Sequence, residues 1–405
     1  LVDPAAPRVV MTRGADQSIA AARFDLSGLP RIESMLLGRP VGEVPPLVER
    51  LCGVCPAAHH LAGVAALEAL RPDDSWAGVP ATARLLRRLL HHGSVLATHA
   101  FRLLAQQGRD EAVVLHKLAK AAMAAAGSPG HFPTTAVPGG ARQPADPDAV
   151  AAARGMVDNA LSEARSLALG ALATDTAPTP FQGCDVALVD DDGNADLLGG
   201  LLRAVGPDGQ VVAEGRPAQW ARLVAESRPG DPAARPYLLA LGPEGGKYRV
   251  GPVSQLRVGP LSTPESRQLQ LRWLEGGSAP AARAVVTLHC VESIAVLLAD
   301  PLLLDAEVSQ TLPAVSAATG VGWVDGARGL LVHSYTTDSA GVLVGAQILT
   351  PTAQNEYWLA RLLLQAADAD SAALEDAVRE ADPCLPCATA PKGRMGLVVE
   401  WEEGS

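Results

Sequence analysis

Apolar residues recur at helical spacing through most of the chain, in sequence rich in Ala and Leu. Both features favour amphipathic or buried helices. The pattern predicts helices in seven segments: 57–70, 80–106, 110–126, 147–171, 263–275, 280–299 and 354–380. We therefore expect a mainly helical protein.

The segment 172–262 differs, because it is richer in Gly, Pro and Asp and contains short β-branched runs such as GQVVAEG and YRVGPV. A second strand pattern, GLLVHSYTTDSAGVLVGAQIL, has turn residues from Asp338 to Gly341 and predicts a hairpin. No repeat of fixed period is visible. We expect an α+β, mainly α fold: one domain over residues 1–405, with a central helical bundle, small peripheral β-sheets, and a mixed peripheral region at 172–262.

Composition narrows the class of protein. Of the 405 residues, 48% are hydrophobic and 19% charged, which is typical of a globular protein. The formal net charge of -11 argues against nucleic acid or an anionic membrane as partner. The apolar stretches are interrupted before the roughly 18 residues that a bilayer span needs, and the segment LVDPAAPRVVMTRGAD lacks a secretory pattern. We expect a soluble, cytoplasmic protein without direct membrane insertion.

Two Cys-x-x-Cys pairs, Cys52/Cys55 in RLCGVCPAAHH and Cys384/Cys387 in DPCLPCATA, carry the candidate chemistry. Thiolates are ligands for soft transition metals. The spacing leaves three interpretations open: one shared metal site, two separate functions such as a redox disulfide, or structural zinc. Zinc modules usually hold their pairs about 15–20 residues apart, whereas most of the chain lies between these two. A shared site requires the fold to bring both ends of the chain together.

The surroundings of the pairs add to this picture. The first pair precedes a helix that begins near Pro56, where the helix dipole favours thiolates. The second pair follows a helix predicted at 368–381. Six cysteines are too few for a disulfide framework in a chain of this length, which indicates a reducing compartment. We interpret Cys184 and Cys290 as small buried side chains.

Both cysteine motifs resemble known sequences in their wider context. The segment RIESMLLGRPVGEVPPLVERLCGVCPAAHHLAG, residues 31–63, and DPCLPCATA, residues 382–390, resemble the two metal-binding motifs of nickel-iron hydrogenase large subunits. The CPAAHH and PTAQN segments are more similar to the cytoplasmic, cofactor-reducing branch of that family. Further landmarks follow in the family order, namely His99, His131, YRVGPV, Glu292, Arg328, His333 and Asn355.

The resemblance implies an enzyme that splits dihydrogen reversibly into protons and electrons at a nickel-iron centre. It implies that Cys52 and Cys384 are terminal nickel ligands. Cys55 and Cys387 would bridge nickel to an iron that carries carbon monoxide and cyanide. Soft sulfur ligands in a distorted arrangement suit nickel and leave a coordination position open.

The resemblance also implies roles for residues around the cysteines. Arg328 would hold its guanidinium over the open metal position, and Glu49 would carry protons away. His59 would donate a hydrogen bond to a bridging cysteine. Asp382 and Pro383 would shape the second cysteine loop, with Asp382 also binding the guanidinium.

Four further landmarks have a weaker assignment. For His99, His131, His333 and Glu292 we prefer structural or relay roles over metal ligation.

Some positions depart from the family pattern. Glu33 matches a carboxylate that helps to bind Mg²⁺ in many members, but Ala390 stands where they have a histidine, so magnesium would lose a ligand. The family protease normally cuts after that histidine, so we expect the tail PKGRMGLVVEWEEGS, residues 391–405, to be retained here. The family's N-terminal R-x-E-G is not recognisable, and Asp325-Gly326 stands where many relatives carry Glu-Ala-Pro.

No further cysteine group is available for an iron-sulfur cluster, so electrons require a partner. The resemblance implies an iron-sulfur small subunit, maturation chaperones and, in the cytoplasmic branch, a flavin module that reduces NAD(P). Two alternatives keep the same residues, namely a hydrogen-sensing regulatory subunit with slow turnover and an unprocessed, metal-free precursor. A third alternative, an electron-transfer scaffold without catalysis, is disfavoured because all four cysteines are present.

Overall fold

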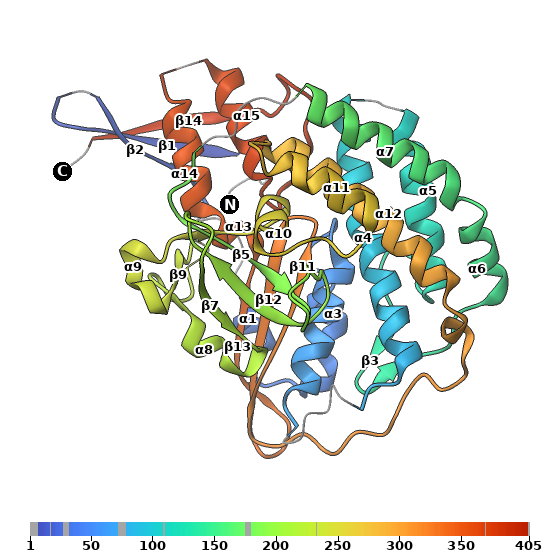
Figure 1. The fold of residues 1–405 in the computed structure, drawn as a ribbon. Coiled ribbons are helices and arrows are strands. Elements are labelled where there is room, and N and C mark those ends of the chain that lie inside the picture. Colours follow the sequence, from blue (N-terminus) through green and yellow to red (C-terminus); the bar gives the residue numbers. More distant parts are fainter. Residues whose placement is uncertain are drawn as a thin grey trace.

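Four long helices, α4, α5, α7 and α12, pack against one another and form the helical half of the protein (Figure 1). The structure is a computed structural model that describes residues 7–16, 18–26, 32–71, 78–107, 110–174, 180–231, 233–368 and 370–403. Residues 1–6 and Arg31, the first residue of the N-terminal motif, lie outside these ranges.

The α-helices are α1 (Glu33–Leu36), α2 (Pro45–Val48), α3 (Pro56–Glu68), α4 (Ala81–Gln107), α5 (Asp110–Ala125), α6 (Pro147–Arg154), α7 (Val157–Ala173), α8 (Trp220–Leu223), α9 (Gly242–Gly245), α10 (Pro252–Val258), α11 (Pro264–Trp273), α12 (Ala279–Ala299), α13 (Pro351–Gln354), α14 (Glu356–Gln365) and α15 (Ser371–Ala381).

The sequence prediction of a mainly helical α+β protein is confirmed, and most helices lie where apolar periodicity placed them. Two long predicted segments are interrupted. Segment 147–171 forms α6 and α7, separated at Gly155 and Met156, and segment 354–380 contributes to α13, α14 and α15. Side-chain caps mark the starts of α6 and α15, where Asp146 and Asp370 accept hydrogen bonds from backbone N–H groups, whereas α7 and α14 begin without a side-chain cap.

Helix α12 is the one described helix that is long and apolar enough to cross a bilayer, but nearly all of it is buried inside the protein. Its apolar residues point in every direction, as expected for a helix surrounded by protein. The sequence analysis treated its polar residues as interruptions. In the fold, polar residues such as Arg283 and Glu292 are also buried and find partners.

The strands form small sheets around the helical half. The strands are β1 (Arg8–Arg13), β2 (Ile19–Phe24), β3 (Ala136–Val137), β4 (Gly140–Ala141), β5 (Cys184–Val189), β6 (Leu201–Val205), β7 (Val211–Gly215), β8 (Val224–Glu226), β9 (Pro236–Leu238), β10 (Tyr248–Arg249), β11 (Thr319–Gly326), β12 (Gly329–Thr337), β13 (Leu343–Leu349) and β14 (Val398–Glu403). The predicted strand in GQVVAEG is β7. YRVGPV is only partly a strand, because the chain turns at Gly251 and Pro252 begins α10.

The sheet β11-β12-β13 is the one that positions the candidate site. The predicted hairpin is formed by β12 and β13, and Asp338 accepts backbone hydrogen bonds from Ala340 and Val342 in its turn. Strand β11 was missed because its glycines weaken the strand pattern. Added Cβ atoms at Gly320 and Gly322 would lie 2.3 Å from backbone atoms of α3. These glycines therefore let α3 lie directly on the strand.

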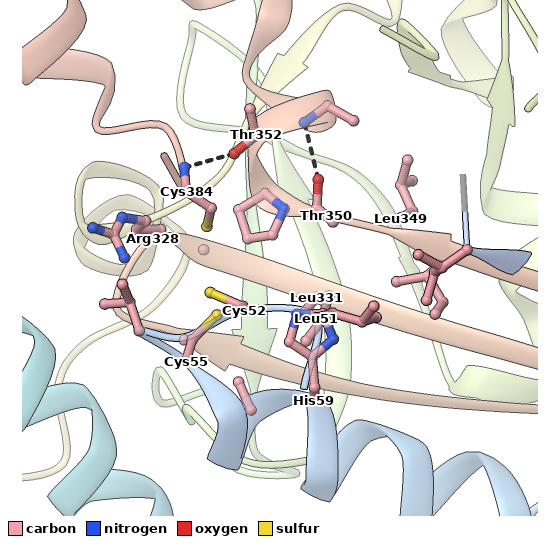
Figure 2. Close-up of a pocket in the computed structure, with 18 of the residues that line it drawn as sticks. Leu51, Cys52, Cys55, His59, Arg328, Leu331, Leu349, Thr350, Thr352 and Cys384 are labelled. Atoms are coloured by element: carbon pink, nitrogen blue, oxygen red, sulfur yellow. Dashed lines mark hydrogen bonds between the residues drawn. The ribbon is translucent and has the colours of Figure 1, made fainter. Parts of the chain in front are cut away.

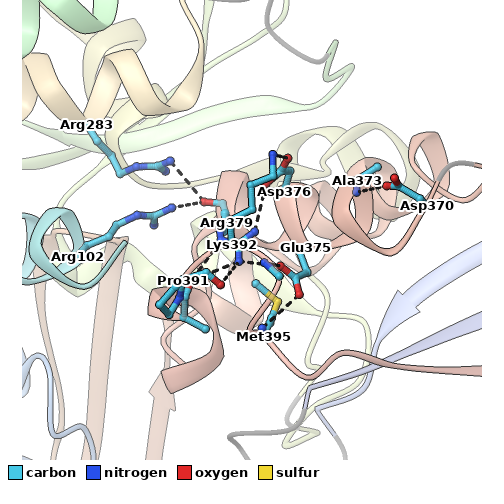
Figure 3. Close-up of polar contacts among 12 residues, drawn as sticks. Arg102, Arg283, Asp370, Ala373, Glu375, Asp376, Arg379, Pro391, Lys392 and Met395 are labelled. Atoms are coloured by element: carbon cyan, nitrogen blue, oxygen red, sulfur yellow. Dashed lines mark hydrogen bonds and ion pairs between the residues drawn. The ribbon is translucent and has the colours of Figure 1, made fainter. Parts of the chain in front are cut away.

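Segments near the two ends of the chain meet in another three-stranded sheet, of order β14-β1-β2, in which β14 pairs parallel to β1 (Figure 1). Helix α15 holds the segment that leads into β14. Glu375 accepts hydrogen bonds from the backbone N–H groups of Gly393 and Met395, and Arg379 donates to the carbonyl oxygens of Ala390 and Pro391 (Figure 3). Strand β14 was not predicted from the sequence.

We predict that the C-terminal segment contributes measurably to stability. Met395 is 1% exposed and belongs to the main hydrophobic core. Met395→Ala should therefore lower the free energy of unfolding by about 2–5 kcal/mol, as large-to-small changes in a core do. Met156→Ala, at a side chain that is 38% exposed, is the control and should cost less than about 1 kcal/mol. Equal urea denaturation midpoints for both variants would show that the segment is not docked.

Candidate metal centre

Cysteines from opposite ends of the chain meet in one cavity. Cys52 and Cys55 lie in the loop before α3, and Cys384 lies between α15 and the 3₁₀ helix η5 (Pro386–Thr389). The side chains of Cys52, Cys55 and Cys384 lie close together in this cavity, and Cys52 and Cys384 both raise the pKa of Cys55 (Figure 2). The Cys384 backbone N–H donates to the Thr352 hydroxyl over 2.7 Å, which fixes the second loop against α13. The required approach of the two cysteine loops is thus present.

Cys387 lies apart from the other three cysteines. It is 2% exposed, packs with the hydrophobic core and is absent from the lining of the cavity. Burial raises its pKa to about 12, so it is a neutral thiol, which behaves as a small apolar side chain. Among the described residues, no group of three or more His, Cys, Asp or Glu side chains has the arrangement of a complete metal site. The predicted set of four sulfurs is therefore only partly assembled.

Cys52 and Cys55 differ in how readily they lose a proton. A hydrogen bond from Cys55 lowers the pKa of Cys52, although burial opposes this effect. Hydrogen bonds with Cys384 and Cys52, together with burial, raise the pKa of Cys55 well above its usual range. Of these two thiols, Cys52 therefore ionises first, and Cys55 keeps its proton between two sulfur neighbours.

Arg328 lies in the two-residue turn between β11 and β12, because Gly326 pairs with Gly329 across the hairpin. Gly329 adopts a φ of +122°, and an added Cβ would lie 2.6 Å from the backbone nitrogen of Gly251. The guanidinium is 4% exposed, and its Nη1 has no hydrogen-bond partner among the described residues. Burial opposes its charge, but Asp382 and the three cysteines outweigh burial and raise its pKa. A fixed cation thus faces the sulfur atoms.

Asp382 connects this cation to the second cysteine loop. It ends α15 in a left-handed conformation, with a φ of +49°, and Pro383 follows it directly. Its carboxylate oxygens lie 3.3 Å from Arg328 Nε and 2.5 Å from Arg102 Nη1. Burial opposes ionisation of Asp382, but the charges of Arg102, Arg328 and Arg283 outweigh it and lower its pKa. The predicted contact between Asp382 and Arg328 is present in the structure.

His59 lines the same cavity from the first turn of α3. Its Nδ1 lies 3.1 Å from Nε2 of His333, whose Nδ1 lies 2.6 Å from the Tyr335 hydroxyl. Burial lowers the pKa of His59 to about 4, so the imidazole is neutral near pH 7. A neutral ring can still donate one hydrogen bond toward the sulfurs.

Two predicted carboxylates lie in different surroundings. Glu33, the first residue of α1, is partly buried and lines the cavity. Glu49, at the end of α2, does not line it, because its side chain turns toward α3 and lies 3.3 Å from His60 Nδ1. The structure therefore does not bring Glu49 to the cysteines, and its role in proton transfer stays a prediction. At Ala390 the backbone carbonyl accepts from Arg379.

The remaining landmarks have separate surroundings. His99 bonds Thr287 and the carbonyl of Ala327, beside Arg328, and so supports the hairpin turn. Glu292 accepts two backbone hydrogen bonds at the start of α11, which is a capping role. His131 is exposed at the surface, beside Phe132.

Sequence reasoning missed several residues that shape the site, namely Arg102, Arg283, Thr352 and Tyr335. Arg102 and Arg283 donate to the backbone carbonyl of Arg379, at the end of α15 (Figure 3). The available sequence signal is an arginine among apolar residues of an Ala- and Leu-rich helix, as at Arg283 in α12 and at Arg102 near the end of α4, since a buried charge must find a partner. For Tyr335 the sequence pattern indicates only a position in a strand and gives no indication of a role in the site.

The cavity has a volume of about 840 Å³ and is lined mainly by apolar side chains, with Cys52, Cys55, Cys384, His59 and Arg328 among them. Its donor set fits an anionic metal-thiolate centre. The unpartnered Arg328 Nη1 offers positive charge, and sulfur ligands favour a soft metal. Cys387, three residues after Cys384, would complete the set by turning out of the core.

Comparison with known proteins gives consistent results. Residues 31–110 match a family described as nickel-dependent hydrogenase. The chain is 27% identical over 393 residues to a protein of the F420-non-reducing hydrogenase vhu of Methanococcus voltae, covering 86% of this chain and 92% of that protein. It is 28% identical over 458 residues to the NAD-reducing hydrogenase HoxS subunit beta of Cupriavidus necator, covering 97% and 93% respectively.

Solved structures agree with these relatives. An NAD⁺-reducing [NiFe]-hydrogenase in the H₂-reduced state matches with a TM-score of 0.80 and 26% identity, over 93% of this chain and 95% of that chain. The Ni-Fe-Se hydrogenase of Desulfovibrio vulgaris Hildenborough matches with a TM-score of 0.64 and 16% identity, over 94% and 97%. The second match supports the fold alone.

We predict that metal binding needs Cys387 as well as the three assembled cysteines. Cys387→Ser should reduce bound nickel and iron to less than about a tenth of the wild-type content, because a hydroxyl is a poor ligand for soft metals. Cys290→Ser is the matched control at a buried cysteine in α12 and should retain the metals. Metal analysis of the purified proteins decides; unchanged metal content in Cys387→Ser would exclude this cysteine as a ligand.

Proposed function

Because the chain belongs by sequence and fold to the large subunits of the nickel-dependent hydrogenases, we propose that it is the catalytic subunit that splits dihydrogen heterolytically. The reaction is reversible and yields two protons and two electrons from each H₂. The observation that carries the proposal is the meeting of Cys52, Cys55 and Cys384 beneath Arg328. A lone structural zinc site would not need a cation held over its sulfurs.

The proposed centre uses all four cysteines. Cys52 and Cys384 would be terminal ligands of nickel, and Cys55 and Cys387 would bridge to an iron with carbon monoxide and cyanide ligands. When bound, this centre supplies an open coordination position and accepts the electrons. The position of Cys55 between two other thiols supports its bridging role. Cys387 would have to rotate from the core into the cavity.

The chain's own groups would orient and polarise the reactant. The Arg328 guanidinium, anchored at Nε by Asp382, keeps Nη1 available toward the cavity. A preorganised cation in a site that excludes water stabilises developing negative charge without further reorganisation. His59 would donate a hydrogen bond to sulfur. Glu49 would act farther from the metals, through its buried contact with His60.

Magnesium is the least supported part of the proposed cofactor set. Glu33 lines the cavity and could take part in binding it. However, residue 390 offers no imidazole, and its carbonyl oxygen already accepts from Arg379. Any magnesium beside Glu33 would need a different set of ligands.

Electron transfer would require an iron-sulfur small subunit, and the resemblance to NAD-reducing hydrogenases supports a further flavin module that reduces NAD(P) in the cytoplasm. Maturation chaperones would deliver the metals. We also propose that residues 391–405 are retained, within a single domain of residues 1–405. The pairing of β14 with β1 and the contacts of Glu375 with Gly393 and Met395 support retention.

Infrared spectroscopy of the purified complex tests the cofactor. Bands of metal-bound carbon monoxide and cyanide, with nickel and iron in equal amounts, are the expected result. A metal-loaded protein without these bands would contradict the proposed centre. Turnover with a dye acceptor would then separate a catalytic subunit from a hydrogen sensor.

Arg328→Lys tests the role of the cation. Lysine keeps the charge but cannot hold it by the planar fork that binds Asp382, so we expect H₂ oxidation to fall by about 10²-fold or more at unchanged metal content. Arg216→Lys, at a side chain that is 61% exposed, should leave activity unchanged. Equal activity of the two variants, measured with a dye acceptor and normalised to nickel, would remove Arg328 from the mechanism.

A further inference from the structure

Three buried side chains form a hydrogen-bonded line from the cavity into the sheet. His59 is 4% exposed, and both His333 and Tyr335 are 0% exposed. His59 Nδ1 lies 3.1 Å from His333 Nε2, and His333 Nδ1 lies 2.6 Å from the Tyr335 hydroxyl. We infer that Tyr335 and His333 are positioning residues that fix the tautomer of His59, so that its Nε2 carries the proton and donates it toward the cysteine sulfurs. The use of this hydrogen bond in catalysis rests on the proposed function.

Both histidines in the line are buried, and neither forms an ion pair with a carboxylate of the described residues, in contrast to His60 beside Glu49. Burial lowers the pKa of His59 to about 4, and burial, together with His59, lowers that of His333 well below its usual range. A neutral imidazole has one N–H donor and one acceptor nitrogen. The two hydrogen bonds of His333 can therefore be arranged in only two ways. Either Tyr335 donates to His333 and His333 donates to His59, or His59 donates to His333 and His333 donates to Tyr335.

The tyrosine selects the direction. Burial raises the pKa of Tyr335, so its hydroxyl keeps its proton, and no other hydrogen bond of this hydroxyl occurs among the described residues. If Tyr335 donates to His333 Nδ1, then His333 donates from Nε2 to His59 Nδ1. His59 must then carry its own proton on Nε2. In the opposite direction the tyrosine proton would remain buried without an acceptor, which is unfavourable.

Local packing leaves space for this line. Gly63 lies one turn after His59 on α3, and an added Cβ there would lie 3.4 Å from the Tyr335 hydroxyl and 3.7 Å from His333 Nδ1. The third close neighbour is a methyl group of Val48, at 3.3 Å. The hydroxyl thus lies against α3 at Gly63, and His333 is its hydrogen-bond partner among the described residues.

The orientation matters at the cysteines. His59 lines the cavity together with Cys52 and Cys55, and His333 occupies its Nδ1, so Nε2 is the ring nitrogen left for the sulfurs. An N–H group stabilises a negatively charged sulfur, whereas a lone pair would repel it. Tyr335 and His333 therefore act on the sulfurs through His59 without touching them. A partner that fixes the orientation of a histidine commonly affects metal binding or activity by 10- to 100-fold.

Nuclear magnetic resonance of the metal-free protein tests the tautomer directly. With ¹⁵N-labelled histidine, long-range ¹H–¹⁵N correlations distinguish a proton on Nδ1 from one on Nε2. The expected wild-type result is Nε2–H at both His59 and His333, with assignment by loss of the His59 signals in His59→Gln. An Nδ1–H form of His59 in the wild-type protein would overturn the inference.

Tyr335→Phe removes the group that sets the direction. We expect His59 to become a mixture of tautomers in the metal-free protein. In the loaded protein, the cyanide and carbon monoxide bands should shift and H₂ oxidation should fall about tenfold at equal metal content. Tyr248→Phe is the control, because Tyr248 is equally buried and donates its own hydrogen bond to Gln354. Unchanged His59 tautomers in Tyr335→Phe would overturn the inference.

Variants at His333 keep the test decisive if Tyr335→Phe folds poorly. The amide of His333→Gln both accepts and donates, and should preserve Nε2–H at His59, whereas His333→Leu should lose it. The metal-free spectra also separate this inference from the proposed function. Absence of the infrared bands with Nε2–H intact would refute the function alone, and a mixed wild-type tautomer with normal bands would refute only the inference.

Discussion

The direct contact between α3 and β11 is the constraint on which the site depends. Gly320 and Gly322 let the helix backbone approach the strand so closely that a Cβ at either position would overlap it. This contact places the N-terminal turn of α3, with Cys55 and His59, beside the β11–β12 turn that carries Arg328. Close packing tolerates little adjustment. The relative position of the first cysteine loop and Arg328 therefore depends on two glycines that take no part in the chemistry themselves.

Ion pairs hold the other half of the site, the loop that carries Cys384, in place. Asp382 ends α15 and receives Arg328 on one carboxylate oxygen and Arg102 on the other, so the second cysteine loop is anchored to both the hairpin and α4. Helix α15 also holds the segment leading to β14 through Glu375 and Arg379. The same helix thus fixes the loop of Cys384 and the sheet that joins the two chain ends.

Local patterns explain what the sequence could predict. Apolar periodicity located α3, α4 and α12, and the turn residues at Asp338 located the β12–β13 hairpin, because these signals lie within a few residues of one another. Strand β11 was not predicted, since its glycines make sense only against α3. Likewise, the sequence identified the cysteines and Arg328 through resemblance. It could not show that Glu49 turns toward His60 or that Tyr335 supports His59, because both depend on tertiary contacts.

Buried positive charge gathers beside the second cysteine loop. Arg102, Arg283 and Arg328 act on the buried carboxylate of Asp382, and Glu380 adds a second negative charge that acts on Arg283. Buried charges are costly unless compensated, and thiolates are the compensating groups within reach. Among Cys52, Cys55 and Cys387, only Cys52 has a lowered pKa, to which the charge of Arg328 contributes, so negative charge on sulfur forms most readily at Cys52.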